Sequence, residues 1–366
     1  MRIVHVETGT NLYGGALQVL YLLEGLSERK VENILVCPAS SQIGSAAQNL
    51  ADKIYPVPMA GDLDLMFIYR LWRILRSERP DLLHLHSRRG ADILGGLAGR
   101  LAGIPVVLSR RVDNPESSTW AAIKYRLYRK VITISENIRE VLLQAGVPGG
   151  KVVCVPSAVD VNAYRHNCDR QWFESEFPIP PQAKVCAVIA QLITRKGHRY
   201  LFKAFREISE TIPNCHLLVF GKGPLENKLK EQCHHLGIEH QVHFLGFRKD
   251  LMRCLCCVDV VIHPAELEGL GVSLLQAAAA GVPIVATTTG GIPEIVHHEI
   301  NGYLVPVGDT RGLAKHVINL LNDTQLARHL GLAGREIASK SFSIVSMVQG
   351  NLQVYTELLG LPPQAS

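Results

Sequence analysis

Short apolar runs alternate with amphipathic stretches along most of this chain, and the alternation comes in two successive series. Continuous apolar runs bounded by turn residues are typical of buried strands, whereas an apolar repeat of about 3.6 residues is typical of helices. Strand–helix alternation predicts a parallel sheet with right-handed crossovers, so we expect an α/β protein with two doubly wound sheets. The expected strands of the first series are Arg2–Val6, Ile34–Cys37, Ile54–Val57, Asp81–His86, Pro105–Arg110, Val131–Ser135 and Val152–Pro156, and those of the second are Val185–Leu192, Leu217–Gly221, Val242–Leu245, Val258–His263, Pro283–Thr287 and Tyr303–Val305.

The two series are separated by a stretch without periodicity, between about Ala158 and Gln182, in which Asn and Pro residues indicate a linker. A chain of 366 residues suits two domains. We therefore expect domains at 1–165 and 166–344, with a last helix at about 345–366 that packs back on the first domain. Ligands of such sheets bind beyond the carboxyl ends of the strands, so the loops there should face one cleft between the domains. The expected helices are Ala16–Leu26, Met66–Ser77, Ala91–Ala102, Thr119–Arg129, Ile138–Ala145, His198–Thr211, Leu225–Leu236, Leu251–Cys257, Leu274–Ala280 and Ser341–Leu359.

Composition narrows the function only slightly. A net charge of +5 favours an anionic ligand or membrane surface, and no motif with interleaved aromatics indicates nucleic-acid binding. The nine Cys lie mostly in apolar segments, which predicts a reducing cytosol, and the spacing Cys254 to Cys257 has no second pair for a zinc site. The chain begins directly as a strand, without a signal peptide, and contains no run of 18 apolar residues. We therefore expect a cytoplasmic protein.

One segment, residues 263–277, carries the clearest functional signal. It leaves an apolar strand, passes a glycine turn and enters an Ala-rich helix, a geometry that points free backbone N–H groups at an anion. Glu268 lies in the turn, where a carboxylate beside an anion suits a ligand that also carries hydroxyls, such as a nucleotide sugar. Gln276 lies about two helical turns further along.

Three other loops that follow expected strands contain cations or glycine pairs. Arg195 and Lys196 precede a helix, where their charges would be unfavourable unless an anion binds there; a solvated basic loop is the alternative. Gly14-Gly15 permits close approach of a phosphate or sugar to the backbone, and so does Gly290-Gly291. A tight turn would explain Gly14-Gly15 equally well, and a tight strand–helix connection would by itself explain much of the pattern at Gly290-Gly291.

Two strand ends of the first series carry polar residues. His84 and His86 face the same side of a strand; we expect a satisfied core histidine at His84 and a polar contact to substrate at His86. A metal site would need a third ligand, and none is obvious. Arg110 and Arg111 favour an anionic acceptor or diphosphate, with a surface ion-pair network as the alternative.

The stretch from Met66 to Arg76 has an apolar stripe with arginines between its members. A core-packed helix with a basic outer face is the default interpretation, and a membrane-surface helix is the functional alternative.

With these residues considered together, the chain resembles the retaining family-4 glycosyltransferases of GT-B fold, also called group 1 glycosyltransferases. The segment from Glu268 to Ala277 is similar to that family's pattern of Glu-Gly-Phe-Gly, a seven-residue gap and Glu-Ala, and the likeness covers nearly the whole chain. The resemblance implies two Rossmann-like domains facing a central cleft and sugar transfer from a nucleotide diphosphate sugar, with retention and without an essential metal. Further similar motifs are Gly14-Gly15, Val155–Asp160, Lys196–His198, Gly221–Pro224, Phe244–Arg248 and Gly290–Glu294.

Roles follow from the resemblance residue by residue. Lys196 would bind the diphosphate, helped by Arg195, and Glu268 would contact the donor sugar. The remaining donor-side positions are the backbone of Leu270, Gly271 and Val272, the glycines Gly14 and Gly15, which would lie near the donor phosphate and the acceptor, and the loop at Phe247 and Arg248, which would flank the base.

The sequence departs from the family pattern at three places. Gln276 stands where the family has a Glu for the ribose hydroxyls, Gln191 stands where it has an arginine, and Arg110-Arg111 stands where it often has a His. The expected acceptor is a glycan or glycolipid hydroxyl, with His86, Arg110 and Arg111 on the acceptor side, in cell-surface polysaccharide or lipopolysaccharide synthesis at the inner membrane. A non-catalytic nucleotide-sugar-binding protein and a nucleotide-sugar epimerase on the same scaffold are the alternatives.

Overall fold

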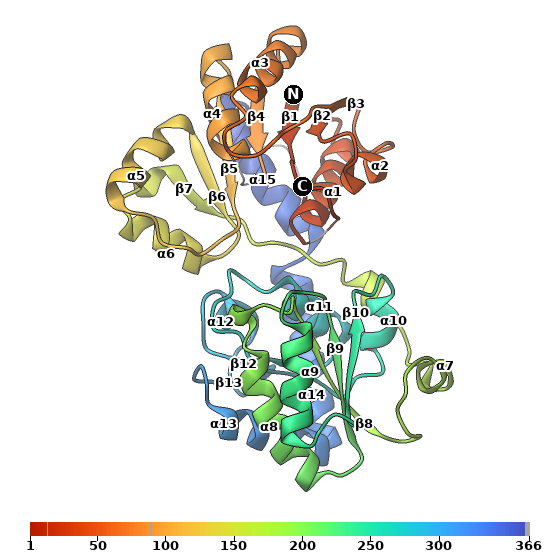
Figure 1. Cartoon of the computed structure of the whole chain (residues 1–366). Coiled ribbons are helices and arrows are strands. Elements are labelled where there is room, and N and C mark those ends of the chain that lie inside the picture. Colours follow the sequence, from red (N-terminus) through yellow and green to blue (C-terminus); the bar gives the residue numbers. More distant parts are fainter. Residues whose placement is uncertain (13, 88–89, 363–366) are drawn as a thin grey trace. The chain divides into compact units, whose positions relative to one another are not determined.

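The chain forms two compact units, each built around its own parallel sheet (Figure 1). The structure is a computed structural model that describes residues 1–12, 14–87 and 90–362. Unit 1 contains Met1–Ala158 together with the segment from Ile344 onward, and unit 2 contains Val159–Ser343. The chain thus passes into unit 2 at Val159, within the sequence-predicted first domain of 1–165, and returns to unit 1 at Ile344.

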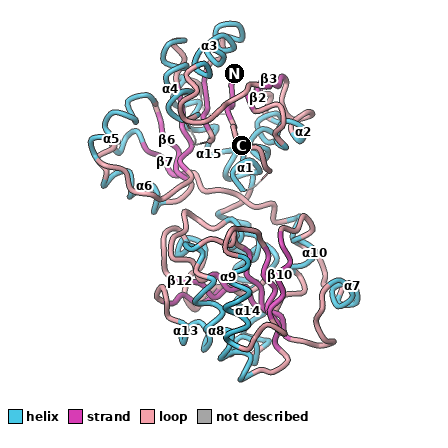
Figure 2. Tube along the Cα trace, viewed as in Figure 1, coloured by secondary structure: helices cyan, strands magenta, loops and turns pink. Residues whose placement is uncertain are grey.

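The sheet of unit 1 has seven strands in the order β3-β2-β1-β4-β5-β6-β7, all paired in parallel. Figure 2 draws the strands in magenta and the helices in cyan. The order reverses between β1 and β4, which are neighbours in the sheet although β2 and β3 lie between them in sequence. The strands are β1 (Arg2–Val6), β2 (Glu32–Cys37), β3 (Lys53–Pro56), β4 (Leu82–Leu85), β5 (Val106–Arg110), β6 (Lys130–Thr133) and β7 (Val152–Cys154).

Helices cover the sheet of unit 1 with two apolar layers. One layer packs the sheet against α3 and α4, and the other packs it against α1 and α15. The last helix, α15, places Met347, Val348 and Leu352 in a core with Ile3 and Leu26. The helices of unit 1 are α1 (Gly14–Glu28), α2 (Gln42–Ala46), α3 (Met66–Glu78), α4 (Ala91–Ala102), α5 (Ser118–Lys124), α6 (Glu136–Gln144) and α15 (Ile344–Leu359).

The sheet of unit 2 has six parallel strands in the order β10-β9-β8-β11-β12-β13, and this order reverses between β8 and β11. Its largest core packs α8, α9 and α13 on one face. The strands are β8 (Lys184–Ile189), β9 (Cys215–Phe220), β10 (Val242–Gly246), β11 (Val260–His263), β12 (Ile284–Thr287) and β13 (Gly302–Val305), and the helices are α7 (Arg170–Glu176), α8 (His198–Thr211), α9 (Glu226–Leu236), α10 (Leu251–Leu255), α11 (Val272–Ala280), α12 (Ile292–Ile295), α13 (Thr310–Asn322) and α14 (Thr324–Ser341). The prediction of two doubly wound parallel sheets is confirmed.

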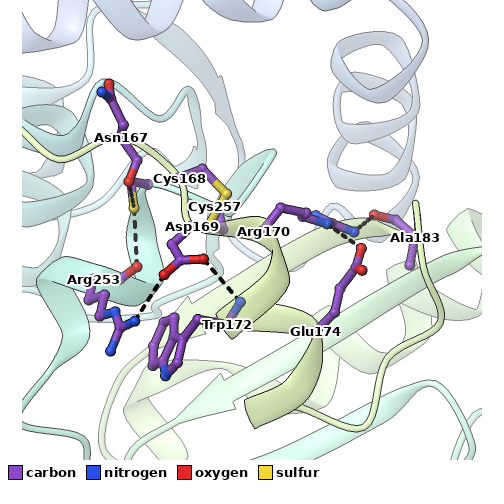
Figure 3. The surroundings of a disulfide bond; sticks show 10 residues. Asn167, Cys168, Asp169, Arg170, Trp172, Glu174, Ala183, Arg253 and Cys257 are labelled. Carbon is purple, nitrogen blue, oxygen red and sulfur yellow. Dashed lines mark hydrogen bonds and ion pairs between the residues drawn. A yellow bond between two sulfur atoms is a disulfide. The ribbon is translucent and has the colours of Figure 1, made fainter.

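A disulfide joins Cys168 to Cys257 in unit 2 (Figure 3). It ties the segment before α7 to the residues after α10, and an ion pair of 3.1 Å between Asp169 and Arg253 supports the same junction. Asp169 also caps α7 by accepting from the Trp172 amide at 3.1 Å. The expectation of reduced thiols is wrong for this pair, and part of the presumed linker is a helix.

No helix among the described residues is both long enough and apolar enough to cross a membrane.

Candidate functional site

In unit 2, two loops that carry predicted site residues lie where the strand order reverses. The loop after β8 carries Lys196, and the loop after β11 carries Glu268. Ligands of open α/β sheets bind at such switch points, beyond the carboxyl ends of the strands. The fold therefore brings these two sequence-predicted residues to the position that the sheet topology favours for a ligand.

Three buried side chains meet at this point. Lys196 Nζ forms an ion pair with Glu268 Oε2, and His263 Nε2 lies 2.9 Å from the same oxygen. Burial alone would raise the pKa of Glu268, but the His263 hydrogen bond and the Lys196 charge outweigh it and hold that pKa well below its usual range. Burial lowers the pKa of His263, against the opposing effect of Glu268. Glu268 is thus an ionised carboxylate that accepts from a neutral imidazole.

Backbone contacts fix the Glu268 loop on both sides. The amides of Glu266 and Leu267 donate to the Arg195 carbonyl at 2.8 and 3.3 Å, and the Gly291 amide donates to the Glu268 carbonyl at 3.0 Å. Gly290 has a φ of +54°, and a Cβ there would lie 1.8 Å from the Glu268 carbonyl oxygen. The close approach that Gly290-Gly291 permits is therefore one between two loops of the protein.

The start of α11 presents backbone groups to the same region. Gly271 caps this helix with a φ of +99°, and Val272 is its first residue. The first N–H groups of a helix lack partners within it and favour an anion. Leu270 is buried, and Gln276 lies half-buried on α11.

The remaining donor-side residues fall into two groups. Arg195 and Phe247 are exposed, with Phe247 at 50%. Arg248 is instead held by Asp250 through two bonds of 2.8 and 2.6 Å, and by Glu176 at 2.6 Å. Its bond to Asp250 raises the pKa of Arg248, although burial opposes this. Because its guanidinium is bound by these carboxylates, Arg248 holds its own loop in place, whereas the ring of Phe247 is exposed.

In unit 1, a second polar cluster lies at the reversal between β1 and β4. Three buried histidines, His5, His84 and His86, place their ring nitrogens within 4.8 Å of one another, and we call them the histidine trio. Both ring nitrogens of His84 are hydrogen-bonded, Nδ1 to Tyr355 Oη at 2.6 Å and Nε2 to Ser109 Oγ at 2.9 Å, which confirms its expected core role. The sequence interpretation missed His5. The signal was available, because β1 neighbours β4 in a doubly wound sheet and His5 pairs in register with His84.

The two adjacent arginines have different surroundings. Arg110 donates to the carbonyls of Val112 and Asn114 at 2.9 and 2.7 Å and pairs with Glu116 at 3.1 Å, so it braces the loop after β5. Arg111 instead lies near the buried Glu7, a residue given no role from the sequence.

The glycine pair at the start of α1 borders the same cluster. Gly14 is the first residue of α1, and a Cβ built on Gly15 would lie 3.6 Å from Arg111 Cδ. The structure thus brings Gly15, Arg111, Glu7 and the trio to one end of the sheet of unit 1.

Comparisons with known proteins find similar sequences and a similar fold. The chain is 26% identical over 305 residues to the N-acetyl-alpha-D-glucosaminyl L-malate synthase of Bacillus anthracis, covering 81% of this chain and 80% of that relative. It is 22% identical to the UDP-Gal:alpha-D-GlcNAc-diphosphoundecaprenol alpha-1,3-galactosyltransferase of Escherichia coli, covering 98% and 97%. It resembles the crystal structure of Anabaena HepE in complex with UDP and glucose with a TM-score of 0.85 and 22% identity, covering 98% and 99%.

Family models match both units. Residues 169–337 match the model of glycosyl transferases group 1, and residues 13–163 match that of glycosyltransferase family 4. The fold is of GT-B type, and the chain belongs to the group 1 glycosyltransferases of family 4.

Proposed function

We propose that this chain is a retaining glycosyltransferase that moves a sugar from a nucleotide diphosphate sugar to a hydroxyl of a glycan or glycolipid. The observation that carries the proposal is the buried Lys196–Glu268–His263 group at the switch point of unit 2. A fixed carboxylate beside a cation and a helix N-terminus suits a ligand that combines a diphosphate with sugar hydroxyls. No metal or cofactor is needed in this proposal.

The chemistry divides between the diphosphate and the sugar. The bond from the anomeric carbon to the phosphate oxygen breaks with its electron pair on phosphate, where Lys196 and the N-terminus of α11 stabilise the developing charge. Both donors to Glu268 converge on Oε2, which leaves Oε1 to accept from a hydroxyl of the donor sugar. Arg195, exposed at the same loop, adds a second cation for the diphosphate.

Retention follows if the acceptor attacks from the face that the diphosphate leaves. The acceptor oxygen bonds to the anomeric carbon, and its proton passes to the departing phosphate oxygen. This route makes Glu268 an orienting group that is not consumed in a covalent intermediate. Names of relatives support a uridine nucleotide and a lipid-linked or polysaccharide acceptor, since one relative is named for UDP-Gal and diphosphoundecaprenol and another for lipopolysaccharide core biosynthesis.

A peripheral contact with the cytoplasmic face of an anionic membrane belongs to the same proposal. Four apolar side chains at the start of α3 are exposed, namely Leu63 at 92%, Leu65 at 69%, Met66 at 58% and Tyr69 at 50%. Arg73 and Arg76 are exposed on the same helix, whereas Arg70 is held by Asp64. The parent chain should sediment with phosphatidylglycerol vesicles, and the variant Arg73→Gln/Arg76→Gln should stay in the supernatant. Unchanged sedimentation of the variant would contradict this role.

The direct test is transfer from a panel of nucleotide sugars (UDP-, GDP- and ADP-linked) to glycan and glycolipid acceptors. Lys196→Ala and Glu268→Gln should each abolish transfer, while Lys222→Ala, an exposed lysine on the next βα loop, should not. Full activity in either site variant would overturn these roles. Nucleotide binding without turnover would instead indicate a non-catalytic binding protein, and conversion of a donor without acceptor an epimerase.

A further inference from the structure

The hydrogen bonds of the histidine trio determine which ring nitrogens carry protons. Asn33 is fully buried, and its Nδ2 faces two carbonyl oxygens, those of Leu23 at 3.3 Å and Val31 at 3.2 Å. Carbonyls only accept, so this nitrogen is fixed and Asn33 Oδ1 faces His5 Nε2 at 3.3 Å. His5 therefore donates through Nε2.

The proton positions then propagate to His86. Burial lowers the pKa of His5 to about 4, so the ring is neutral and its Nδ1 carries a lone pair. His86 Nε2 lies 3.0 Å from that Nδ1 and must donate to it. Burial also lowers the pKa of His86 well below its usual value. The neutral His86 ring consequently has a bare lone pair on Nδ1.

That lone pair has no partner among the described residues, and neither does the Nε–H of Arg111. Both atoms are shielded from bulk water, and both side chains line the same pocket of about 40 Å³, together with Ser87 and Ser109. A buried polar atom without a partner costs about 1–3 kcal/mol. Among the described residues that line the pocket, His86 Nδ1 is thus a shielded acceptor and Arg111 Nε a shielded donor without partners.

We propose that His86 Nδ1 and Arg111 Nε form a subsite for a hydroxyl group of the sugar acceptor. A hydroxyl is both donor and acceptor, so one group can donate to His86 and accept from Arg111. His5 and Asn33 act as positioning residues, because they keep the Nδ1 of His86 unprotonated. The subsite rests on the proposed transferase function and adds to it the chemistry by which unit 1 recognises a hydroxyl.

A divalent metal on the same histidines is the competing occupant. The trio offers three imidazoles, the ligands that zinc and copper prefer. However, both nitrogens of His84 are already bonded, to Tyr355 and Ser109, and the Arg111 charge acts on His84 and His86. A hydroxyl satisfies the free atoms without bringing a second cation beside Arg111.

The test uses the full chain labelled with ¹⁵N in its histidines. The spectrum should show His86 protonated at Nε2 and bare at Nδ1, and methyl α-D-glucopyranoside should shift that Nδ1 signal. His216 and His243 form an equivalent pair in unit 2, with nitrogens 2.9 Å apart, and should not respond. The affinity for the glucoside should fall about five- to tenfold in Arg111→Met and in Asn33→Leu, with nucleotide binding unchanged.

Four results would overturn the subsite: a protonated Nδ1 on His86, no shift with the glucoside, a bound water next to His86 that the glucoside does not displace, or stoichiometric binding of Zn²⁺ that His5→Gln removes. The first readout is made on the parent chain, so it does not depend on a variant that folds. None of these measurements uses a donor or turnover. Failure of the subsite is therefore distinguishable from failure of the transfer assay.

Discussion

Removing one partner of the Lys196–Glu268 ion pair should lower the free energy of unfolding of unit 2 more than removing both partners does. Both side chains are about nine-tenths buried, each with 11% of its side-chain surface exposed. In Lys196→Met, Glu268 keeps its bond from His263 but loses the neutralising charge. Loss of one partner of a buried pair typically costs about 3–5 kcal/mol, and since His263 remains we expect about 3 kcal/mol.

The expected shift is large enough to measure by calorimetry. For a domain of this size, 1 kcal/mol corresponds to about 2–4 °C, so Lys196→Met should lower the unfolding temperature of unit 2 by about 6–12 °C. The double variant Lys196→Met/Glu268→Leu removes both charges and fills the space with apolar atoms. Its free energy of unfolding should lie within about 1 kcal/mol of that of the parent chain. The remaining loss arises because His263 no longer has its hydrogen-bond partner.

The matched control is Lys222→Met, which removes an exposed lysine from a neighbouring loop and should shift the transition by less than about 2 °C. Neither the single nor the double variant at Lys196 should transfer sugar, so stability and activity separate in the double variant. The reasoning is refuted if Lys196→Met unfolds like the control, or if the double variant is no more stable than the single one.

Three further predictions concern stability. Reduction of the Cys168–Cys257 disulfide, whose cysteines are 89 residues apart, should destabilise unit 2 by about 4 kcal/mol in calorimetry. The variant Cys168→Ser/Cys257→Ser should show the same loss of stability, and adding reductant should not change its unfolding temperature. An unchanged transition after reduction would contradict a structural role of the disulfide. Gly290→Ala should lower the free energy of unfolding by more than about 2 kcal/mol, because the added Cβ would clash with the Glu268 carbonyl. The control Gly237→Ala is also at positive φ but in open space, and it should lower the free energy of unfolding by about 1 kcal/mol. Equal losses in the two variants would argue against the loop contact. Burial lowers the pKa of all three histidines of the trio in the folded state. Unit 1 should therefore be most stable above about pH 6.5 and lose stability as the pH falls, because the imidazoles of the unfolded chain bind protons at a higher pH than those of the folded chain. An unfolding temperature that stays constant between about pH 7 and 4.5 would contradict this.

The two sheets were predictable because buried parallel strands are continuous apolar runs. Every expected strand overlaps an observed one, from Arg2–Val6 to Gly302–Val305. Helices were harder where turn residues interrupt the pattern: the stretch after Ala158 is rich in Asn and Pro, yet Asp169 caps a helix there. The disulfide was missed because pairing depends on which loops the fold brings together, and Cys168 and Cys257 are distant in sequence.

Single residues of the site were predictable, but their partners were not. Lys196 and Glu268 each stood out beside a helix start, and their ion pair depends on the adjacency of β8 and β11. Arg110 and Arg111 look alike in sequence. They differ in the structure because Arg110 is the last residue of β5 and its guanidinium reaches the carbonyls of the following loop, whereas Arg111 lies beyond the strand and its Nε–H has no partner among the described residues.

In each sheet a cation lies close to a carboxylate where the strand order reverses, which explains how these charges are tolerated away from water. At the β8–β11 reversal the charge of Lys196 is balanced by Glu268, and at the β1–β4 reversal Arg111 lies near Glu7. An isolated buried charge would be costly, so each cation is accompanied by a carboxylate. A ligand that binds either site therefore competes with, or adds to, an existing partner.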